Sequence, residues 1–213
     1  LLGSGGACGG GSGGVVPKPP LDVPTFQSDR AFADLEKQVS FGPRLPGSPG
    51  HQAQLEWMRA TLQALADRVV EQPFTTSTPF GGPFSFVNLL AVFNGRTPGA
   101  ATFVGAHWDT RPVCDQDPDP ARRNQPVPGA NDGASGVAIL LELARLLHDN
   151  PPSGPVYLIF LDAEDSGKEG SALLDQGYCL GANYLAQHWP EDLPRPGRGA
   201  ILDLVGGTKH NPR

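Results

Sequence analysis

The chain has 213 residues, of which 38% are hydrophobic and 18% are charged, which is an ordinary composition for a globular protein. Its net charge of -6 includes no basic cluster, so the electrostatics give no support for a nucleic-acid partner. No apolar run approaches the roughly 20 residues that a helix needs to cross a bilayer. The chain is long enough for one sizeable core.

Residues 1–24 are expected to form a flexible leader outside the fold. The chain begins LLGSGGACGGGSGG, and the stretch that follows is rich in proline. With Ala7 before Cys8, this stretch resembles the end of a bacterial lipoprotein signal. The protein would then be exported, and it would be periplasmic or tethered to a membrane through Cys8. An expression linker or a plain disordered leader accounts for the same letters, because Gly5 stands where the signal usually has a larger aliphatic residue.

If Cys8 carries a lipid, Cys114 and Cys179 remain as an even pair of cysteines. In an oxidising compartment these two residues could form a disulfide. They could equally be unpaired small residues of the core, and the sequence leaves both alternatives open.

Helical spacing gives way to strand patterns in the first half of the folded region. Apolar residues recur at helical intervals in residues 28–39 and 51–66, which are separated by a loop rich in proline and glycine. Residues 68–72 and 85–93 have the pattern of strands, with the turn-rich segment TTSTPFGGP between them. Residues 101–106 predict a short buried strand.

The second half begins with a long loop at residues 111–130, a segment too polar and too rich in proline for a helix or a strand. Loops of this length in a compact domain are usually functional or disordered. Residues 134–148 carry the clearest helical pattern, and residues 156–161 are a continuous apolar run of strand length. Residues 182–188 predict a short helix, and residues 200–205 predict a last strand.

Strands that alternate with helices predict an α/β fold. We expect residues 25–213 to form a three-layer sandwich, in which a mostly parallel mixed sheet is covered by helices on both faces. Parallel strands bring their carboxyl ends to the same edge of the sheet, where ligands usually bind.

Side chains that can bind a metal stand where these elements begin or end. His107 follows the strand of residues 101–106, and Asp132 lies in a glycine-flanked turn before a helix. Glu164 and Asp165 follow the next buried strand, and Asp203 lies inside the last one. A histidine and several carboxylates at one sheet edge are typical of a zinc site. The adjacent Glu-Asp pair favours catalysis, because one carboxylate can bind metal while its neighbour moves protons.

Each of these residues also has a purely structural interpretation. A lone histidine is usually structural, a carboxylate before a helix can be an N-cap, and a Glu-Asp pair can belong to a solvated loop. Asp203 is harder to explain in this way, because a carboxylate flanked by Leu202 and Leu204 is costly to bury without a partner.

The motifs GAHWDT, GANDGASG, FLDAED and ILDLVGG, in this order, resemble the family of zinc aminopeptidases and glutaminyl cyclases (metallopeptidase family twenty-eight). The resemblance extends over residues 26–207. It implies that Asp132 bridges two metals, that His107 and Asp203 hold one zinc, and that Asp165 holds the other. Glu164 would be the general base, with Asp203 beside it in the catalytic site.

The zinc at Asp165 would need one more ligand, which in this family is a histidine far towards the C-terminus. The later histidines here are His188, on a predicted helix, and His210, near the end of the chain. Neither stands in the family's context. We therefore expect the domain to lack its C-terminal part, and one or two zinc ions to be the cofactor.

Two branches of this family would act on the N-termini of peptides or proteins. A glutaminyl cyclase converts an N-terminal Gln to pyroglutamate, and an aminopeptidase hydrolyses the first peptide bond. The stretches PGSPG, TPFGGPFSFVN, LELARLL and ILDLVG resemble the cyclase branch more closely. Asn131, where cyclases commonly have Thr, and Asp165, where Glu is usual, depart from it. A non-catalytic binding relative is a third alternative, against which the retained Glu164 argues.

Trp108 and the acidic loop of residues 111–130 are two further features of the site region. The resemblance implies a tryptophan that walls the substrate pocket, and Trp108 is the candidate for that role. The loop of residues 111–130, which has no clear counterpart in animal cyclases, carries Asp115, Asp117 and Asp119. These acids could bind calcium, but a solvated acidic loop is the simpler interpretation.

Overall fold

The computed structural model describes residues 23–168 and 177–207. The expected leader with Cys8 and the late His210 lie outside these ranges. Among the described residues, no helix is both long enough and apolar enough to span a membrane.

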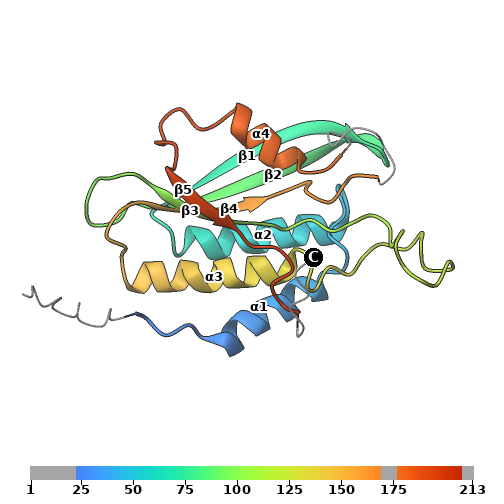
Figure 1. Cartoon of the computed structure of the whole chain (residues 1–213), viewed down its shortest axis with the longest axis horizontal. Coiled ribbons are helices and arrows are strands. Elements are labelled where there is room, and N and C mark those ends of the chain that lie inside the picture. Colours follow the sequence, from blue (N-terminus) through green and yellow to red (C-terminus); the bar gives the residue numbers. More distant parts are fainter. Residues whose placement is uncertain (1–22, 169–176, 208–213) are drawn as a thin grey trace, which may run out of the picture.

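The described strands form one mixed sheet with the order β1-β2-β4-β3-β5 (Figure 1). The strands are β1 (Arg68–Thr78), β2 (Gly81–Phe93), β3 (Thr102–His107), β4 (Val156–Leu161) and β5 (Arg198–Ile201). Strand β3 pairs in parallel with β4 and β5, whereas β2 runs antiparallel to both β1 and β4. The carboxyl ends of the three parallel strands therefore meet at one edge.

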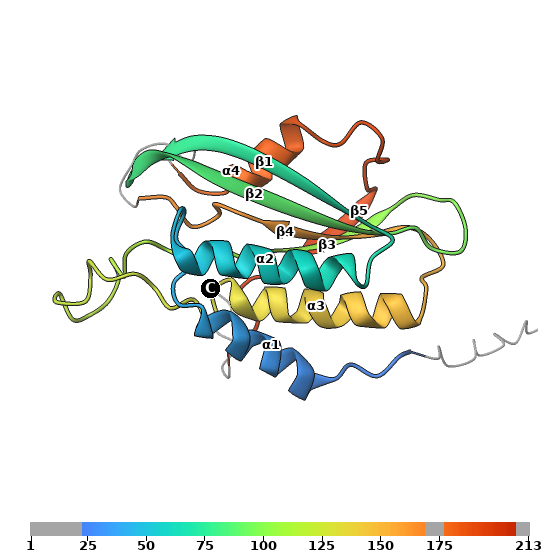
Figure 2. The same ribbon diagram turned by 180° about the vertical axis from the view of Figure 1, so that it is seen from behind.

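Helices cover both faces of the sheet, which confirms the predicted three-layer α/β fold. Helices α1 (Ser28–Ser40), α2 (Pro49–Gln63) and α3 (Ala134–Asp149) lie on one side, and α4 (Leu180–Gln187) lies on the other (Figures 1 and 2). Strand β4 is apolar throughout because it is buried from both sides. Its Leu158 and Phe160 pack in the core with α2 and α3, whereas Tyr157 and Ile159 pack in the core with α4.

The strands β1 and β2 are longer than the sequence predicts. They form one continuous hairpin, in which Thr75 pairs with Ser85 and Thr78 pairs with Gly81. The segment TTSTPFGGP is therefore mostly strand, with its turn at Pro79 and Phe80. Cross-strand pairing explains why its threonines are extended despite the turn-forming residues around them.

The prediction that Asp203 lies inside a buried strand is wrong. Strand β5 ends at Ile201, and Asp203 lies in the loop beyond it with its side chain 53% exposed. The neighbouring Leu204 and Val205 are exposed as well. The apolar residues around Asp203 thus suggested a burial that the described chain does not give them.

Gly136 brings α3 unusually close to the sheet edge. A Cβ atom at this position would lie 2.8 Å from the Cβ of Ala106 and 2.9 Å from the carbonyl oxygen of Leu202. These two residues directly precede His107 and Asp203. The close approach at Gly136 therefore helps to set the distance between two of the predicted metal ligands.

We predict that Gly136→Ala lowers the free energy of unfolding by about 1–3 kcal/mol, because the added methyl group must displace backbone. Urea denaturation measures this change. Gly154→Ala is the matched control, because a Cβ atom there would meet nothing within 4 Å. The control should stay within ~1 kcal/mol of the parent protein, and an equal loss in both variants would contradict the close approach at Gly136.

Candidate metal centre

The predicted site residues meet at the carboxyl ends of the parallel strands. His107 is the last residue of β3, and Asp132 lies in the turn that leads into α3. Glu164 and Asp165 follow β4, and Asp203 follows β5. This is the edge at which an α/β sheet usually carries its ligands.

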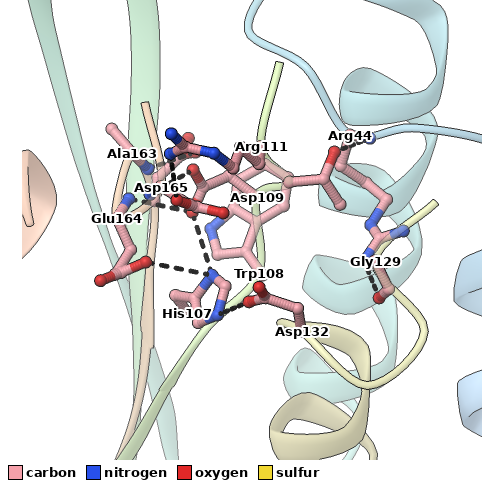
Figure 3. A network of polar contacts seen from close by, with 12 residues as sticks. Arg44, His107, Trp108, Asp109, Arg111, Gly129, Asp132, Ala163, Glu164 and Asp165 are labelled. Atoms are coloured by element: carbon pink, nitrogen blue, oxygen red, sulfur yellow. Dashed lines mark hydrogen bonds and ion pairs between the residues drawn. The ribbon is translucent and has the colours of Figure 1, made fainter. Parts of the chain in front are cut away.

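His107 lies at the centre of the cluster and is buried, with a side-chain exposure of 3% (Figure 3). Its Nε2 atom lies 2.9 Å from Oδ1 of Asp132 and 3.6 Å from Oδ1 of Asp203. Its Nδ1 atom lies 3.4 Å from Oδ1 of Asp109 and 4.0 Å from Oε2 of Glu164. Despite these short distances, neither ring nitrogen has a well-directed hydrogen bond to any described residue.

The donor atoms of this cluster fit a zinc ion. Ligand atoms of His107, Asp132 and Asp203 all lie within 4.8 Å of one another. Imidazole nitrogen and carboxylate oxygen are both ordinary zinc ligands. A buried imidazole that lacks a well-directed hydrogen bond, surrounded by carboxylates, is also costly without a cation.

The charge of the cluster points to a cation as well. Burial alone would lower the pKa of His107, but the carboxylates of Asp109, Asp132 and Asp203 raise this pKa far above its ordinary value.

Asp109 is a residue of this site that sequence reasoning does not assign a role. It is fully buried and accepts hydrogen bonds from the backbone N–H groups of Glu164, at 3.0 Å, and Asp165, at 3.1 Å. It thereby ties the Glu-Asp pair to the end of β3 and faces Nδ1 of His107 (Figure 3). A carboxylate that orients a metal-binding histidine is a common feature of zinc sites. Its position two residues after His107 is the signal that could have identified it.

A buried arginine supports the loop that carries Asp132. Arg44 is fully buried, and its guanidinium donates hydrogen bonds to the carbonyl oxygens of Pro128 and Gly129. Gly129 adopts a φ of +67°, and a Cβ atom there would lie 2.2 Å from Cγ2 of Thr110. Burial lowers the pKa of Arg44 to about 10, which leaves it charged at neutral pH. Arg44 and Gly129 thus fix the approach of the chain to Asp132.

Glu164 has the surroundings expected of a group that takes up and releases protons. Its side chain is 31% exposed, and burial of the remainder raises its pKa above the ordinary value. The thiol of Cys179 lies 3.5 Å from Oε1 and donates to it. Cys179 and Cys114 are both free, so the structure does not support the disulfide between them.

Asp165 lies beside the cluster, in an ion pair. Its Oδ1 atom lies 2.9 Å from Nη1 of Arg111. Burial and the negative charge of Asp132 raise the pKa of Asp165 to about 7, although Arg111 acts in the opposite direction. The role of Asp165 as a ligand of a second zinc stays a prediction. His188 is not placed to be the further ligand expected for that zinc, because it follows α4 and stacks on Tyr184 with 4.2 Å between the ring centroids.

The prediction that Trp108 walls a substrate pocket is wrong. Trp108 is fully buried, and its ring stacks on His51 with 4.3 Å between the ring centroids. Its Nε1 atom donates to the carbonyl oxygen of Val87 at 3.2 Å. Trp108 therefore belongs to the hydrophobic core that α2 and α3 form with the sheet.

The acids of the loop of residues 111–130 are used within the loop itself. Asp115 pairs with Arg111 at 2.6 Å. Oδ1 of Asp117 accepts the N–H of Asp119, and Oδ1 of Asp119 accepts the N–H of Ala121. These contacts stabilise turns. They favour the interpretation of a structural acidic loop over that of a calcium site.

Comparison with known proteins yields matches over most of the described chain. The model of peptidase family M28 matches residues 88–204. A probable zinc metalloprotease of Pyrenophora tritici-repentis is 30% identical over 76% of this chain and 37% of its own length. The chain thus spans well under half the length of that curated relative.

Solved structures resemble the fold closely. A leucine aminopeptidase precursor from Bacteroides thetaiotaomicron superposes with a TM-score of 0.81 at 34% identity, covering 88% of this chain and 65% of its own. The glutaminyl cyclase of Porphyromonas gingivalis superposes with a TM-score of 0.79 at 36% identity, covering 86% and 62%. An aminopeptidase precursor and a glutaminyl cyclase therefore share this architecture.

We predict that Asp109→Asn weakens zinc binding about 10–100-fold, because an amide cannot accept both backbone N–H groups and also face His107 as an anion. Competition against a chromophoric chelator measures the affinity. Asp149→Asn, an exposed change at the far end of α3, is the control and should leave the affinity unchanged. Zinc binding by Asp109→Asn at the parental affinity would remove Asp109 from the site.

Proposed function

The chain belongs to peptidase family M28, and from this premise we propose that it forms part of a zinc-dependent enzyme that converts N-terminal Gln to pyroglutamate. The observation that carries the enzymatic part of the proposal, which a cyclase and an aminopeptidase share, is the juxtaposition of a candidate zinc site with a partly buried carboxylate. The Oε2 atom of Glu164 lies 4.0 Å from Nδ1 of His107, the central residue of the cluster. A metal next to a proton-transferring carboxylate is the arrangement that activates an amide or a water molecule.

The choice of the cyclase rests on several stretches of sequence and on one relative. PGSPG begins α2, where the hydroxyl of Ser48 accepts the N–H of His51 at 3.2 Å. TPFGGPFSFVN forms the turn of the long hairpin and the first part of β2. Both stretches resemble the cyclase branch, and a glutaminyl cyclase is among the structures at 36% identity.

In this proposal Glu164 carries the proton between the two nitrogens of the substrate. The N-terminal amine attacks the carbon of the Gln side-chain amide, and Glu164 takes the proton that the amine loses. The bond to the amide nitrogen then breaks, Glu164 returns the proton to that nitrogen, and ammonia leaves. Bound zinc would polarise the amide carbonyl. The raised pKa of Glu164 suits this role, because a proton shuttle works best with a pKa near the working pH.

An aminopeptidase is the second candidate, and one observation favours it. His107, Asp132 and Asp203 form a ready-made metal-binding triad, whereas a single zinc held by Asp132 and Asp165 would leave His107 and Asp203 without a metal. In a two-zinc enzyme Glu164 would take the proton of a water molecule and pass it to the leaving amine. The number of zinc ions thus separates the two candidates.

The products of a peptide that begins Gln-Leu distinguish these reactions. We expect the full-length, zinc-loaded protein to release ammonia and leave a peptide of unchanged length, which mass spectrometry detects as a loss of about 17 Da. Loss of the first residue would instead identify the aminopeptidase. An unchanged peptide would contradict both and favour the non-catalytic relative.

We predict that Glu164→Gln lowers kcat by ~10²–10⁴-fold, because the amide cannot accept the proton, while zinc affinity stays close to that of the parent. A coupled ammonia assay measures the rate, and chelator competition measures the zinc affinity. Glu191→Gln, at an exposed position after α4, is the matched control. Parental turnover by Glu164→Gln would exclude Glu164 as the proton carrier.

A further inference from the structure

Arg111 connects the long loop of residues 111–130 with the predicted metal ligand Asp165. Its guanidinium is largely buried, with a side-chain exposure of 12%, and Asp165 is equally shielded at 12%. An ion pair removed from solvent in this way has a stronger effect on its members than a surface pair has. Arg111 is the first residue of this loop. The sequence alone does not indicate what the loop does.

On the loop side, Asp115 holds Arg111 with both of its oxygens. Nε of Arg111 lies 2.9 Å from Oδ1 of Asp115, and Nη2 lies 2.6 Å from Oδ2. The base of the loop is closed by backbone bonds from Val127 to Arg111, at 3.1 Å, and from Cys114 to Gln125, at 2.8 Å. The bidentate pair with Asp115 fixes the plane of the guanidinium.

On the site side, Nη1 is the remaining nitrogen of the guanidinium. It donates to Oδ1 of Asp165 at 2.9 Å and to the carbonyl oxygen of Gly167 at 3.2 Å (Figure 3). The guanidinium also lies over the ring of Tyr178, 5.5 Å from its centroid, and Tyr178 forms a β-bridge with Asp165. Because Asp115 occupies the other two nitrogens, Arg111 contacts Asp165 through one oxygen only.

We propose that Arg111 is a positioning residue for zinc binding, which holds Asp165 by one oxygen and leaves the other oxygen to the metal. Asp115 serves this function indirectly, because it prevents the guanidinium from turning to cover both oxygens. One function of the loop of residues 111–130 is then to hold Arg111 and Asp115 in this arrangement beside Asp165. The inference rests on the proposed function, since it gives Asp165 the role of a zinc ligand.

Arg111 could also weaken zinc binding instead of supporting it, and the two effects predict opposite results. A guanidinium is itself a cation, so it could compete with zinc for Asp165. In that case removal of Arg111 would tighten zinc binding. If Arg111 positions the carboxylate, its removal weakens zinc binding, because Asp165 is left free to rotate in a cluster of like charge.

Zinc titration of the purified metal-free protein against a chelator tests the proposal. We expect Arg111→Met to weaken binding of one zinc equivalent about 10–100-fold, the usual effect of removing a partner of a metal ligand. Arg111→Lys should recover part of this loss, and Asp115→Asn should show a smaller one. Arg122→Met is the matched control, because Arg122 is 66% exposed and pairs with Asp119 in the same loop.

A double-mutant cycle with Asp165→Asn shows whether Arg111 acts through Asp165. Arg111→Met should change zinc affinity less than twofold when Asp165 is already replaced. An equal loss in both backgrounds, tighter binding, or parental binding by both Arg111→Met and Asp115→Asn would overturn the inference and leave the proposed function intact. Failure of the parent protein to bind zinc would overturn both. If Arg111→Met does not fold, Asp115→Asn and its own cycle with Asp165→Asn decide.

Discussion

The arrangement of charge around His107 is the constraint on which the site depends. Carboxylates of Asp109, Asp132, Glu164 and Asp203 lie within 4.0 Å of this one buried imidazole. Several carboxylates that are partly buried close together repel one another, and this repulsion lowers the stability of the folded state. A divalent cation at Nε2 would relieve this repulsion. The cluster therefore links the stability of this edge of the sheet to metal binding.

The fold holds this cluster with contacts that do not themselves bind metal. Gly136 allows α3 to approach the segments that precede His107 and Asp203. Asp109 connects β3 to the loop after β4, and Arg44 fixes the chain before Asp132. Each of these contacts joins segments that are far apart in the sequence. Together they explain how predicted ligands from four separate segments keep a common geometry.

Local patterns predicted the elements that depend on local physics. The apolar face of α3 and the continuous apolar run of β4 were identified correctly, because each is buried in the manner that its period indicates. The sequence also pointed to His107, Asp132 and Asp203, whose ligand atoms lie within 4.8 Å of one another, and their role as metal ligands stays a prediction. The errors concern contacts made at a distance. Trp108 is buried where it stacks on His51, and the length of the hairpin depends on cross-strand pairing.

The long-range contacts of Asp109 and Arg111 could not be predicted from the sequence for the same reason. Their partners are Glu164 and Asp165, which lie more than fifty residues further along the chain. No spacing rule connects positions at that separation. Only the parallel pairing of β3 with β4 brings them together. The same pairing explains why the predicted ligands lie close together although the sequence gives no measure of the distances between them.

The position of a bound zinc ion tests the central claim most directly. A crystal of the zinc-loaded protein, with anomalous diffraction recorded at the zinc absorption edge, locates the metal without reference to activity. The account predicts a peak about 2.0–2.2 Å from Nε2 of His107 or from a carboxylate oxygen of Asp132. A zinc peak elsewhere, with His107 and Asp132 still paired to each other, would contradict it.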